Sequence, residues 1–473
     1  MTTAKISEIL AHSGIAFGTS GARGLVEQFS DDVCAAFAVA FLCVMGEQRK
    51  VHRVAIGLDR RPSSPSMAAA CSAAVRALGV EVVDYGVLPT PALCLQAMSD
   101  GVPAIMITGS HIPFERNGIK FYRPDGEITK ADEQAIMRVD AELPRFRAIE
   151  REPVTDVASR RYVARYANWF SEHPLRDKRI GLYQHSAAGR ESSRQVLEAL
   201  GAEVVVLGRS ETFVPLDTEA VSKEDRVKGR GWASQHQLDA LMTTDGDGDR
   251  PLVADEQGHW FRGDVVGLLC ARELGIQALA VPVSCNSAIE MCGAFERVVR
   301  TRIGSPYVLE AMVQLSAEYD RVAGFEANGG FLLGSSLQEG NRRLDALPTR
   351  DALLPALTLM VASAREGRPL SALMNGLPGR YTASERLEHF SAERSRALLA
   401  RWQANLAAME RELGLGDAIV RVDTTDGLRV TLSNGDIVHF RPSGNAPELR
   451  CYVEGSSGAT ARALVMTVLR DLR

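Results

Sequence analysis

Short apolar runs alternate with amphipathic stretches along most of the chain, and the alternation repeats. Residues 53–86 show an apolar strand, a polar loop, an amphipathic helix, Ala-Leu-Gly and a second apolar strand, and residues 179–208 repeat this order. A weaker third copy begins at Ala278. Strands that alternate with helices in this way are typical of parallel sheets with helices on both faces. The repeats therefore predict three similar α/β domains.

Glycines and polar loops add detail to these repeats. Gly79 and Gly201 follow the first two predicted helices, where a left-handed C-cap residue is needed. Ligand sites in parallel sheets lie at the loops beyond the carboxyl ends of the strands. We therefore expect functional residues in three loops, 59–64, 185–190 and 284–287.

The pattern changes after about Arg380. A long helical stretch over 392–413 precedes apolar strands separated by Asp426-Gly427 and Asn434-Gly435, which are signals for two-residue hairpin turns. We expect an α/β protein with three similar mixed α/β domains, largely parallel sheets, and a smaller C-terminal α+β domain, all around a central cleft. The predicted domains are residues 1–150, 151–258, 259–377 and 378–473.

Composition and charge narrow the class of protein. The 473 residues are 45% hydrophobic and 24% charged, which is typical of a globular protein and excludes a disordered chain or a small disulfide scaffold. The net charge of -5 offers no bulk attraction to nucleic acid or to an anionic membrane. None of the eight cysteines belongs to a C-x-x-C pair, and most lie in apolar stretches such as Phe41-Leu42-Cys43-Val44. This pattern predicts buried, reduced thiols. The sequence contains neither a signal-peptide pattern nor a membrane-spanning stretch, so we expect a cytoplasmic protein.

The strongest chemical signal is the segment 245–250, Asp-Gly-Asp-Gly-Asp-Arg. Its glycines let the backbone bend, so that Asp245, Asp247 and Asp249 converge on one point. Convergent carboxylates favour a hard cation such as Mg²⁺. A calcium EF-hand loop is excluded because Arg250 stands where that loop needs glycine, and because residues 251–254 form a predicted strand.

A second signal is Ser110, on a glycine turn just past the apolar run 104–107. A serine in this position is well placed as an exposed nucleophile, and Lys120 could shuttle a proton or contact a phosphate. The G-x-S-x-G elbow of serine hydrolases does not surround it.

Two further loops could bind an anion. The first, residues 17–24, is rich in glycine and contains Arg23, but it matches no nucleotide-binding motif. The second, residues 441–447, follows the last predicted hairpin and combines fixed positive charge with successive N–H groups. Its candidate phosphate contacts are Arg441, Ser443, Gly444 and Asn445, with Arg450 nearby.

These loops, in this order, resemble those of the α-D-phosphohexomutases: a serine loop, a D-G-D-G-D-R metal loop, a sugar loop at 324–329 and an R-P-S-G phosphate loop. The resemblance extends from Phe17 to Glu454. Residues 108–127 and 347–352 are most similar to bacterial phosphomannomutases.

The resemblance implies a role for each loop. Ser110 would carry the transferred phosphoryl group and, with the three aspartates, would hold one Mg²⁺. The other implied roles are a transfer centre surrounded by Arg23, Lys120 and Arg250, sugar hydroxyls facing Glu326 and Asn328, and a second phosphate held by Arg441, Ser443, Gly444 and Asn445.

The implied reaction interconverts a hexose 6-phosphate and a hexose 1-phosphate through a bisphosphorylated sugar, with mannose as the expected sugar. Phosphoglucosamine mutase, phosphoglucomutase and a non-catalytic sugar-phosphate binder are the alternatives. The chain departs from the common family pattern at Ile112 in the serine loop and at Gly330, where no histidine follows Gly329. The base, Lys120 or His111, and the sugar therefore stay open, as does the choice between monomer and homodimer.

Overall fold

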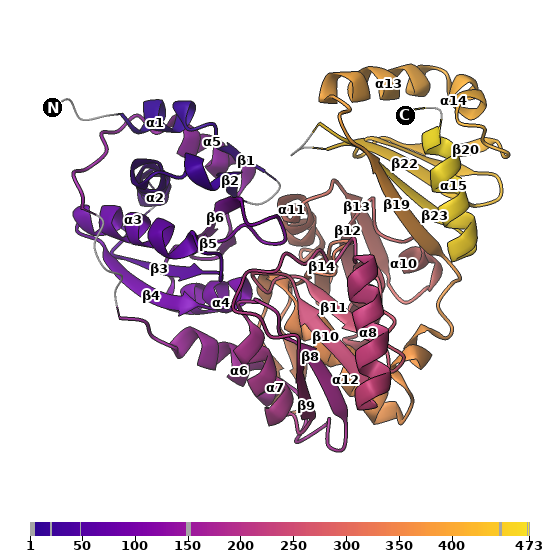
Figure 1. The fold of residues 1–473 in the computed structure, drawn as a ribbon, viewed down its shortest axis with the longest axis horizontal. Coiled ribbons are helices and arrows are strands. Elements are labelled where there is room, and N and C mark those ends of the chain that lie inside the picture. Colours follow the sequence, from indigo (N-terminus) through magenta and orange to yellow (C-terminus); the bar gives the residue numbers. More distant parts are fainter. Residues whose placement is uncertain are drawn as a thin grey trace.

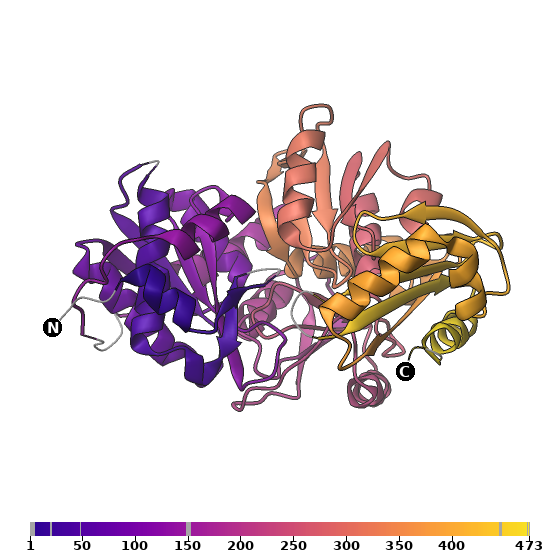
Figure 2. The ribbon, with the colours of Figure 1, turned by 90° about the horizontal axis from the view of Figure 1, so that it is seen from above.

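The computed structural model describes residues 5–18, 21–47, 49–147, 153–443, 447–470 and 472. The chain forms three mixed α/β units followed by a fourth unit built on an antiparallel sheet (Figure 1). The first and fourth units lie at opposite ends of the molecule, and the second and third lie between them (Figure 2). The predicted fold class, three mixed α/β units and a C-terminal α+β unit, is confirmed.

The first unit has a seven-stranded sheet in the order β1-β2-β6-β5-β3-β4, with β7 paired to β6. The β3 strand pairs in parallel with β4 and β5, and the other pairs are antiparallel. Its elements are α1 (Ile6–His12), β1 (Ala16–Phe17), β2 (Ala22–Leu25), α2 (Asp31–Gly46), β3 (Arg53–Leu58), α3 (Ser64–Ala77), β4 (Glu81–Val87), α4 (Thr90–Asp100), β5 (Ala104–Ile107), β6 (Arg116–Arg123), β7 (Gly126–Glu127) and α5 (Lys130–Arg138).

Both faces of this sheet are buried, as the apolar strands predict. Ile56 and Ile105 pack against α2 and α3, whereas their sequence neighbours Ala55 and Met106 pack on the opposite face with α4. Successive side chains of a strand point to opposite faces, so one apolar run serves two helix layers.

The second unit has a four-stranded sheet in the order β11-β10-β8-β9, parallel except for the edge strand β11. Helix α6 leads into it from the first unit. Its elements are α6 (Val157–Trp169), β8 (Arg179–Tyr183), α7 (Arg190–Ala199), β9 (Glu203–Leu207), α8 (Lys223–His236), β10 (Ala240–Thr244) and β11 (Pro251–Ala254).

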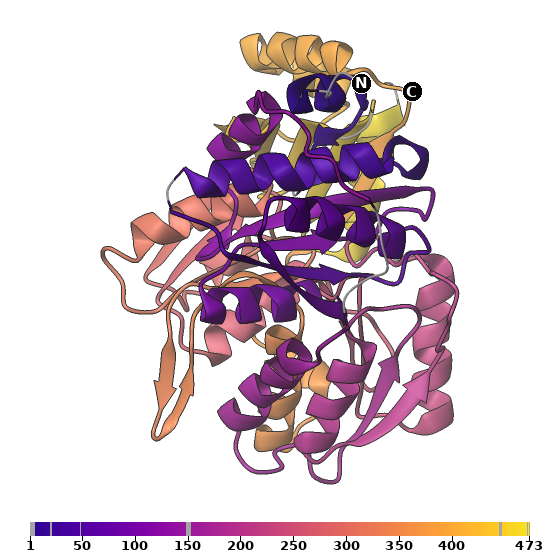
Figure 3. The ribbon, with the colours of Figure 1, turned by 90° about the vertical axis from the view of Figure 1, so that its left-hand side faces the viewer.

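The third unit has a five-stranded sheet in the order β13-β12-β14-β15-β18, and the β16–β17 hairpin extends away from it (Figure 3). Its elements are α9 (Gly263–Glu273), β12 (Ala278–Pro282), α10 (Ala288–Met291), β13 (Arg297–Thr301), α11 (Ser305–Leu315), β14 (Val322–Phe325), β15 (Phe331–Leu333), β16 (Leu337–Glu339), β17 (Arg342–Leu344), β18 (Leu347–Asp351) and α12 (Leu353–Glu366).

The three predicted repeats are strand–helix–strand units in the structure. The strand pairs β3–β4, β8–β9 and β12–β13 are each parallel, and each pair is joined through a helix. Gly79 and Gly201 follow their helices with φ of 74° and 91°, the left-handed backbone that favours glycine. In the third copy the helix, α10, spans only four residues.

The fourth unit is a five-stranded antiparallel sheet in the order β19-β23-β22-β21-β20. The long helix expected over 392–413 is broken at Asn405, whose side chain accepts a hydrogen bond from the N–H of Ala408 and caps the second helix. Its elements are β19 (Tyr381–Leu387), α13 (Ala392–Ala404), α14 (Leu406–Glu412), β20 (Ile419–Asp423), β21 (Leu428–Leu432), β22 (Ile437–Pro442), β23 (Leu449–Gly455) and α15 (Gly458–Arg470).

Two local expectations need correction. The hairpin connections span residues 424–427 and 433–436 rather than two residues each, although Gly427 and Gly435 take positive φ as their turn signals suggest. Cys43 is exposed on α2, because the surrounding helix turns this position away from the core, whereas six of the eight free thiols are buried.

No helix among the described residues is both long and apolar enough to cross a membrane.

Candidate active site

The serine loop directly follows β5 and holds Ser110 in a strained backbone conformation. Ser110 has φ of 55°, the left-handed region that a residue with a side chain rarely adopts. Its N–H donates to Oγ1 of Thr108 at 2.8 Å, and its carbonyl accepts from Nη2 of Arg61 at 2.8 Å. A Cβ atom at Gly109 would lie 2.6 Å from the same guanidinium, so only glycine fits there. The loop thus presents a fixed serine.

Ser110 meets the metal loop, which follows β10 of the second unit. Its Oγ donates to Oδ2 of Asp245 at 2.6 Å. The backbone N–H groups of Asp249 and Arg250 both donate to Oδ1 of Asp245 at 3.2 Å. Carboxylate oxygens of Asp245, Asp247 and Asp249 lie within 4.8 Å of one another, and all three residues are buried. Two loops from different units therefore form one centre.

The crowded carboxylates perturb one another. Burial, followed by Asp247 and Asp249, raises the pKa of Asp245 well above its usual value. Burial and Asp249 also act to raise the pKa of Asp247, but Lys120 and Thr90 outweigh them and lower it. The pKa of Asp249 is lowered against burial by Arg350, Lys120 and Arg250. Repulsion among the three buried carboxylates favours a bound cation at this centre.

The three aspartates fit a Mg²⁺ ion. Oδ1 of Asp247 and Oδ1 of Asp249 are buried and have no hydrogen-bond partner. An unsatisfied buried carboxylate oxygen is costly, and a hard cation with oxygen ligands satisfies it. The donor set therefore suits magnesium.

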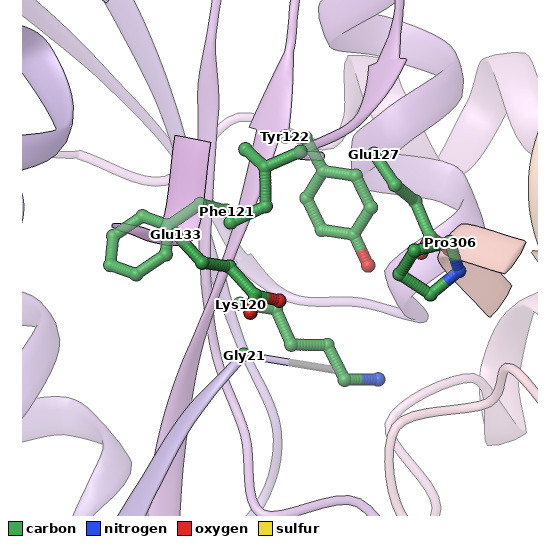
Figure 4. A pocket seen from close by; sticks show the side chains of 8 residues that line it. Gly21, Lys120, Phe121, Tyr122, Glu127, Glu133 and Pro306 are labelled. Atoms are coloured by element: carbon green, nitrogen blue, oxygen red, sulfur yellow. The ribbon is translucent and has the colours of Figure 1, made fainter. Parts of the chain in front are cut away.

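Cationic side chains surround this centre. Nζ of Lys120 donates to Oδ2 of Asp247 at 2.6 Å and to Oδ2 of Asp249 at 2.8 Å. Lys120, on β6, lines a pocket with Tyr122 and Glu127 of the first unit and Pro306 of the third (Figure 4). Burial, with Arg250 and Arg350 nearby, lowers the pKa of Arg23 to about 10.

His111 lies beside both the serine and Arg250. Its Nδ1 accepts from Nη1 of Arg250 at 2.7 Å and lies 3.5 Å from Oγ of Ser110. Burial, followed by Arg250 and Arg23, lowers the pKa of His111 well below its usual value. The imidazole is therefore neutral near pH 7, with Nδ1 as the acceptor.

The expected sugar loop follows β14 and is largely buried. Oε2 of Glu326 accepts from Nη1 of Arg350 at 2.9 Å. Oδ1 of Asn328 accepts from the N–H of Gly330 at 3.0 Å, and its carbonyl accepts from Thr218 at 3.2 Å. This loop contacts the second unit through Thr218.

The sequence pattern missed Arg350, which donates to both Asp249 and Glu326. A signal was available, because Arg350 lies within residues 347–352, one of the two segments most similar to bacterial phosphomannomutases.

The expected phosphate loop lies in the fourth unit. Nε of Arg441 donates to Oδ2 of Asp426 at 2.9 Å, and the N–H of Ser443 donates to the carbonyl of Glu448 at 2.9 Å. Arg450 lies 3.7 Å from a carboxylate oxygen of Glu448. Gly444 and Asn445 lie outside the described residues. No described contact joins this loop to Ser110.

Three segments match domains of known proteins. They match the phosphoglucomutase/phosphomannomutase alpha/beta/alpha domain I over residues 14–142, domain III over 262–381 and the C-terminal domain over 393–470. The chain belongs to this family. It is therefore a phosphohexomutase, an enzyme that moves a phosphoryl group within a sugar phosphate.

Individual relatives match over nearly the whole chain. A phosphomannomutase from Salmonella muenchen is 52% identical, covering 98% of this chain and 97% of the relative. A phosphomannomutase from Sinorhizobium fredii is 44% identical, covering 96% and 97%. The crystal structure of a phosphoglucomutase/phosphomannomutase family protein from Burkholderia thailandensis has the same fold, with a TM-score of 0.72, 20% identity and 96% coverage of both chains.

Proposed function

We propose that the protein interconverts mannose 6-phosphate and mannose 1-phosphate by way of a phosphoserine at Ser110. The observation that carries this proposal is the contact between Oγ of Ser110 and Asp245, which puts a nucleophile against a buried carboxylate cluster. The choice of mannose follows the two relatives named phosphomannomutase.

The proposed reaction has two transfers. Phosphorylated Ser110 donates its phosphoryl group to the free hydroxyl of the sugar phosphate, and the serine oxygen is the leaving group. The bisphosphorylated sugar then reorients, and its other phosphoryl group returns to Ser110. Lys120 and His111 are the two candidates to take the hydroxyl proton, since both lie beside the centre.

Asp245, Asp247 and Asp249 would hold one Mg²⁺ together with the phosphoserine. When bound, Mg²⁺ supplies charge neutralisation to the transferring group. Arg23, which is half-buried, and Arg250, which is buried, add fixed positive charge around the same point.

The substrate would contact two other loops. Glu326 would accept hydrogen bonds from the sugar hydroxyls, and the amide of Asn328 would donate to them or accept from them. The second phosphate, on the substrate and on the bisphosphate intermediate, would bind the fourth unit through Arg441, Ser443, Gly444, Asn445 and Arg450. All eight cysteines are free thiols, in keeping with a cytoplasmic enzyme.

A substrate panel tests the proposal. Purified protein is assayed with the 1-phosphates of mannose, glucose, glucosamine and N-acetylglucosamine, and intact mass and phosphopeptide mapping locate the phosphate. We expect the highest kcat/KM with mannose 1-phosphate and phosphate on Ser110. Ser110→Ala should lower turnover by several orders of magnitude, because it removes the nucleophile.

Ser66→Ala is the matched control, since Ser66 is an exposed serine of the same unit. A Ser110→Ala variant with full activity would overturn the phosphoserine assignment. A preference for another sugar would overturn only the choice of mannose.

A further inference from the structure

Arg350, at the end of β18, joins two loops of the site. Nε and Nη2 donate to Oδ2 of Asp249 at 3.0 and 2.9 Å, and Nη1 donates to Oε2 of Glu326 at 2.9 Å. The residue is only 2% exposed. One guanidinium therefore connects the metal loop of the second unit to the sugar loop of the third.

The residues on either side of this arginine are themselves anchored. Oγ1 of Thr349 donates to Glu127 of the first unit at 2.9 Å. Asp351 accepts from the N–H of Leu353 at 3.0 Å and from the hydroxyls of two tyrosines on α6, Tyr162 and Tyr166. The strand end is thus tied to the first unit and to α6, which leaves the guanidinium little freedom to move.

Gly330 leaves room for this side chain. A Cβ atom at Gly330 would lie 2.8 Å from Cδ, 2.9 Å from Cγ and 3.0 Å from Cβ of Arg350. A larger residue at position 330 is therefore incompatible with the arginine as it lies. A histidine at position 330 would therefore occupy the space that the Arg350 side chain fills.

We propose that Arg350 is a positioning residue for phosphoryl transfer, which holds Glu326 of the sugar loop in a fixed relation to Asp249 of the metal loop. A planar guanidinium reaches both carboxylates with donors fixed in one plane, two of them to Asp249 and one to Glu326, whereas a lysine ammonium is a compact point charge on a flexible stem and does not fix such a geometry. Glu326 acts on the sugar ring only if the proposed function holds, but the link to the metal loop does not depend on the substrate.

The first test measures Mg²⁺ binding without sugar. Dephosphorylated wild-type protein, R350K and R343K are titrated with Mg²⁺ by calorimetry. Lysine keeps the positive charge and its repulsion of the metal, so R350K removes the fixed guanidinium bonds to Asp249 and Glu326 without changing the net charge. We expect Mg²⁺ affinity to fall about tenfold or more in R350K. R343K, which changes an exposed arginine of the β16–β17 hairpin, should match the wild type.

The second test is a double-mutant cycle of R350K and E326Q on kcat/KM, with the hexose phosphate that the wild-type protein turns over fastest. We expect R350K to lower kcat/KM about ten- to hundredfold. If Arg350 acts through Glu326, the double variant is about as slow as the slower single variant, because the two changes break the same link.

Two results overturn the proposal: wild-type Mg²⁺ affinity in R350K, or fully additive losses in the cycle. If R350K does not fold, as judged by thermal unfolding, G330A replaces it in both tests. Its methyl group displaces the arginine without removing charge, and it should give the same losses. A wild-type protein that is inactive on every sugar would overturn the proposed function, while the Mg²⁺ titration would still decide the role of Arg350 at Asp249.

Discussion

Three buried aspartates in one loop need positive charge around them. In the structure this charge comes from Lys120, whose ammonium bridges Asp247 and Asp249, and from Arg350, which donates to the same Oδ2 of Asp249 as Lys120 does. Removing one member of such a buried set leaves its partner uncompensated, so single substitutions here should have large effects.

Asp247→Asn should weaken Mg²⁺ binding about tenfold or more, because it removes one of three convergent carboxylates. Calorimetry measures the affinity, and the Mg²⁺ concentration for half-maximal rate should rise with it. Ca²⁺ should bind without supporting good turnover, because its looser coordination places the phosphate poorly. Asp125→Asn, at an exposed carboxylate of the first unit, is the control. A rate unchanged by chelator would contradict the metal assignment.

Among the elements, the loop between β3 and α3 supports the serine loop. Arg61 is 1% exposed, and its guanidinium donates to Asp59 and to the carbonyls of residues 110, 112, 113 and 116. These bonds hold Ser110 at its positive φ. One buried arginine thus maintains the conformation of the whole loop.

Arg61→Lys keeps the charge but provides too few donors for these acceptors. Each carbonyl left unpaired in the interior costs about 1–3 kcal/mol, so the variant should be clearly less stable. We expect a lower Tm, faster hydrogen exchange over residues 108–116, and a fall in kcat that exceeds any rise in KM. Arg53→Lys, at the half-exposed start of β3, is the control. Unchanged exchange in this loop would show that Arg61 does not hold it.

At the scale of the whole molecule, the fourth unit reaches the others through a few polar contacts. Asp426 accepts from Nε of Arg441 at 2.9 Å and from the N–H of Ile303, in the third unit, at 3.0 Å. Glu454 similarly accepts from Ser287 across this interface. Polar contacts of this kind exchange readily with water, so we expect the fourth unit to open and close over the site.

Arg441→Ala should therefore raise KM and also lower kcat. If Arg441 binds the second phosphate as proposed, this change removes that contact and, with it, the expected closure that would exclude water from a phosphorylated Ser110. A charge-assisted contact is worth about 1.5–3 kcal/mol, so kcat/KM should fall about ten- to hundredfold. Arg421→Ala, an exposed arginine of the same unit, should leave both constants near wild type. A higher KM with an unchanged kcat would support the phosphate contact but contradict the closure.

Sequence and tertiary structure decided different parts of this protein. Sequence patterns predicted the strand–helix–strand repeats, the glycine C-caps, the serine loop and the metal loop, because each depends on residues a few positions apart. They missed the break at Asn405, where side-chain capping overrides helix periodicity.

Only the tertiary structure decided which loops meet. Asp249 and Arg350 are 101 residues apart, Ser110 and Asp245 are 135 apart, and Arg61 reaches Ser110 across 49 residues. The sequence alone identified the serine and metal loops as candidates for chemistry, since backbone propensity and polarity act locally, but it did not single out Arg350. Their partners depended on the packing of separate units, because a hydrogen bond forms only where the fold brings donor and acceptor within about 3 Å.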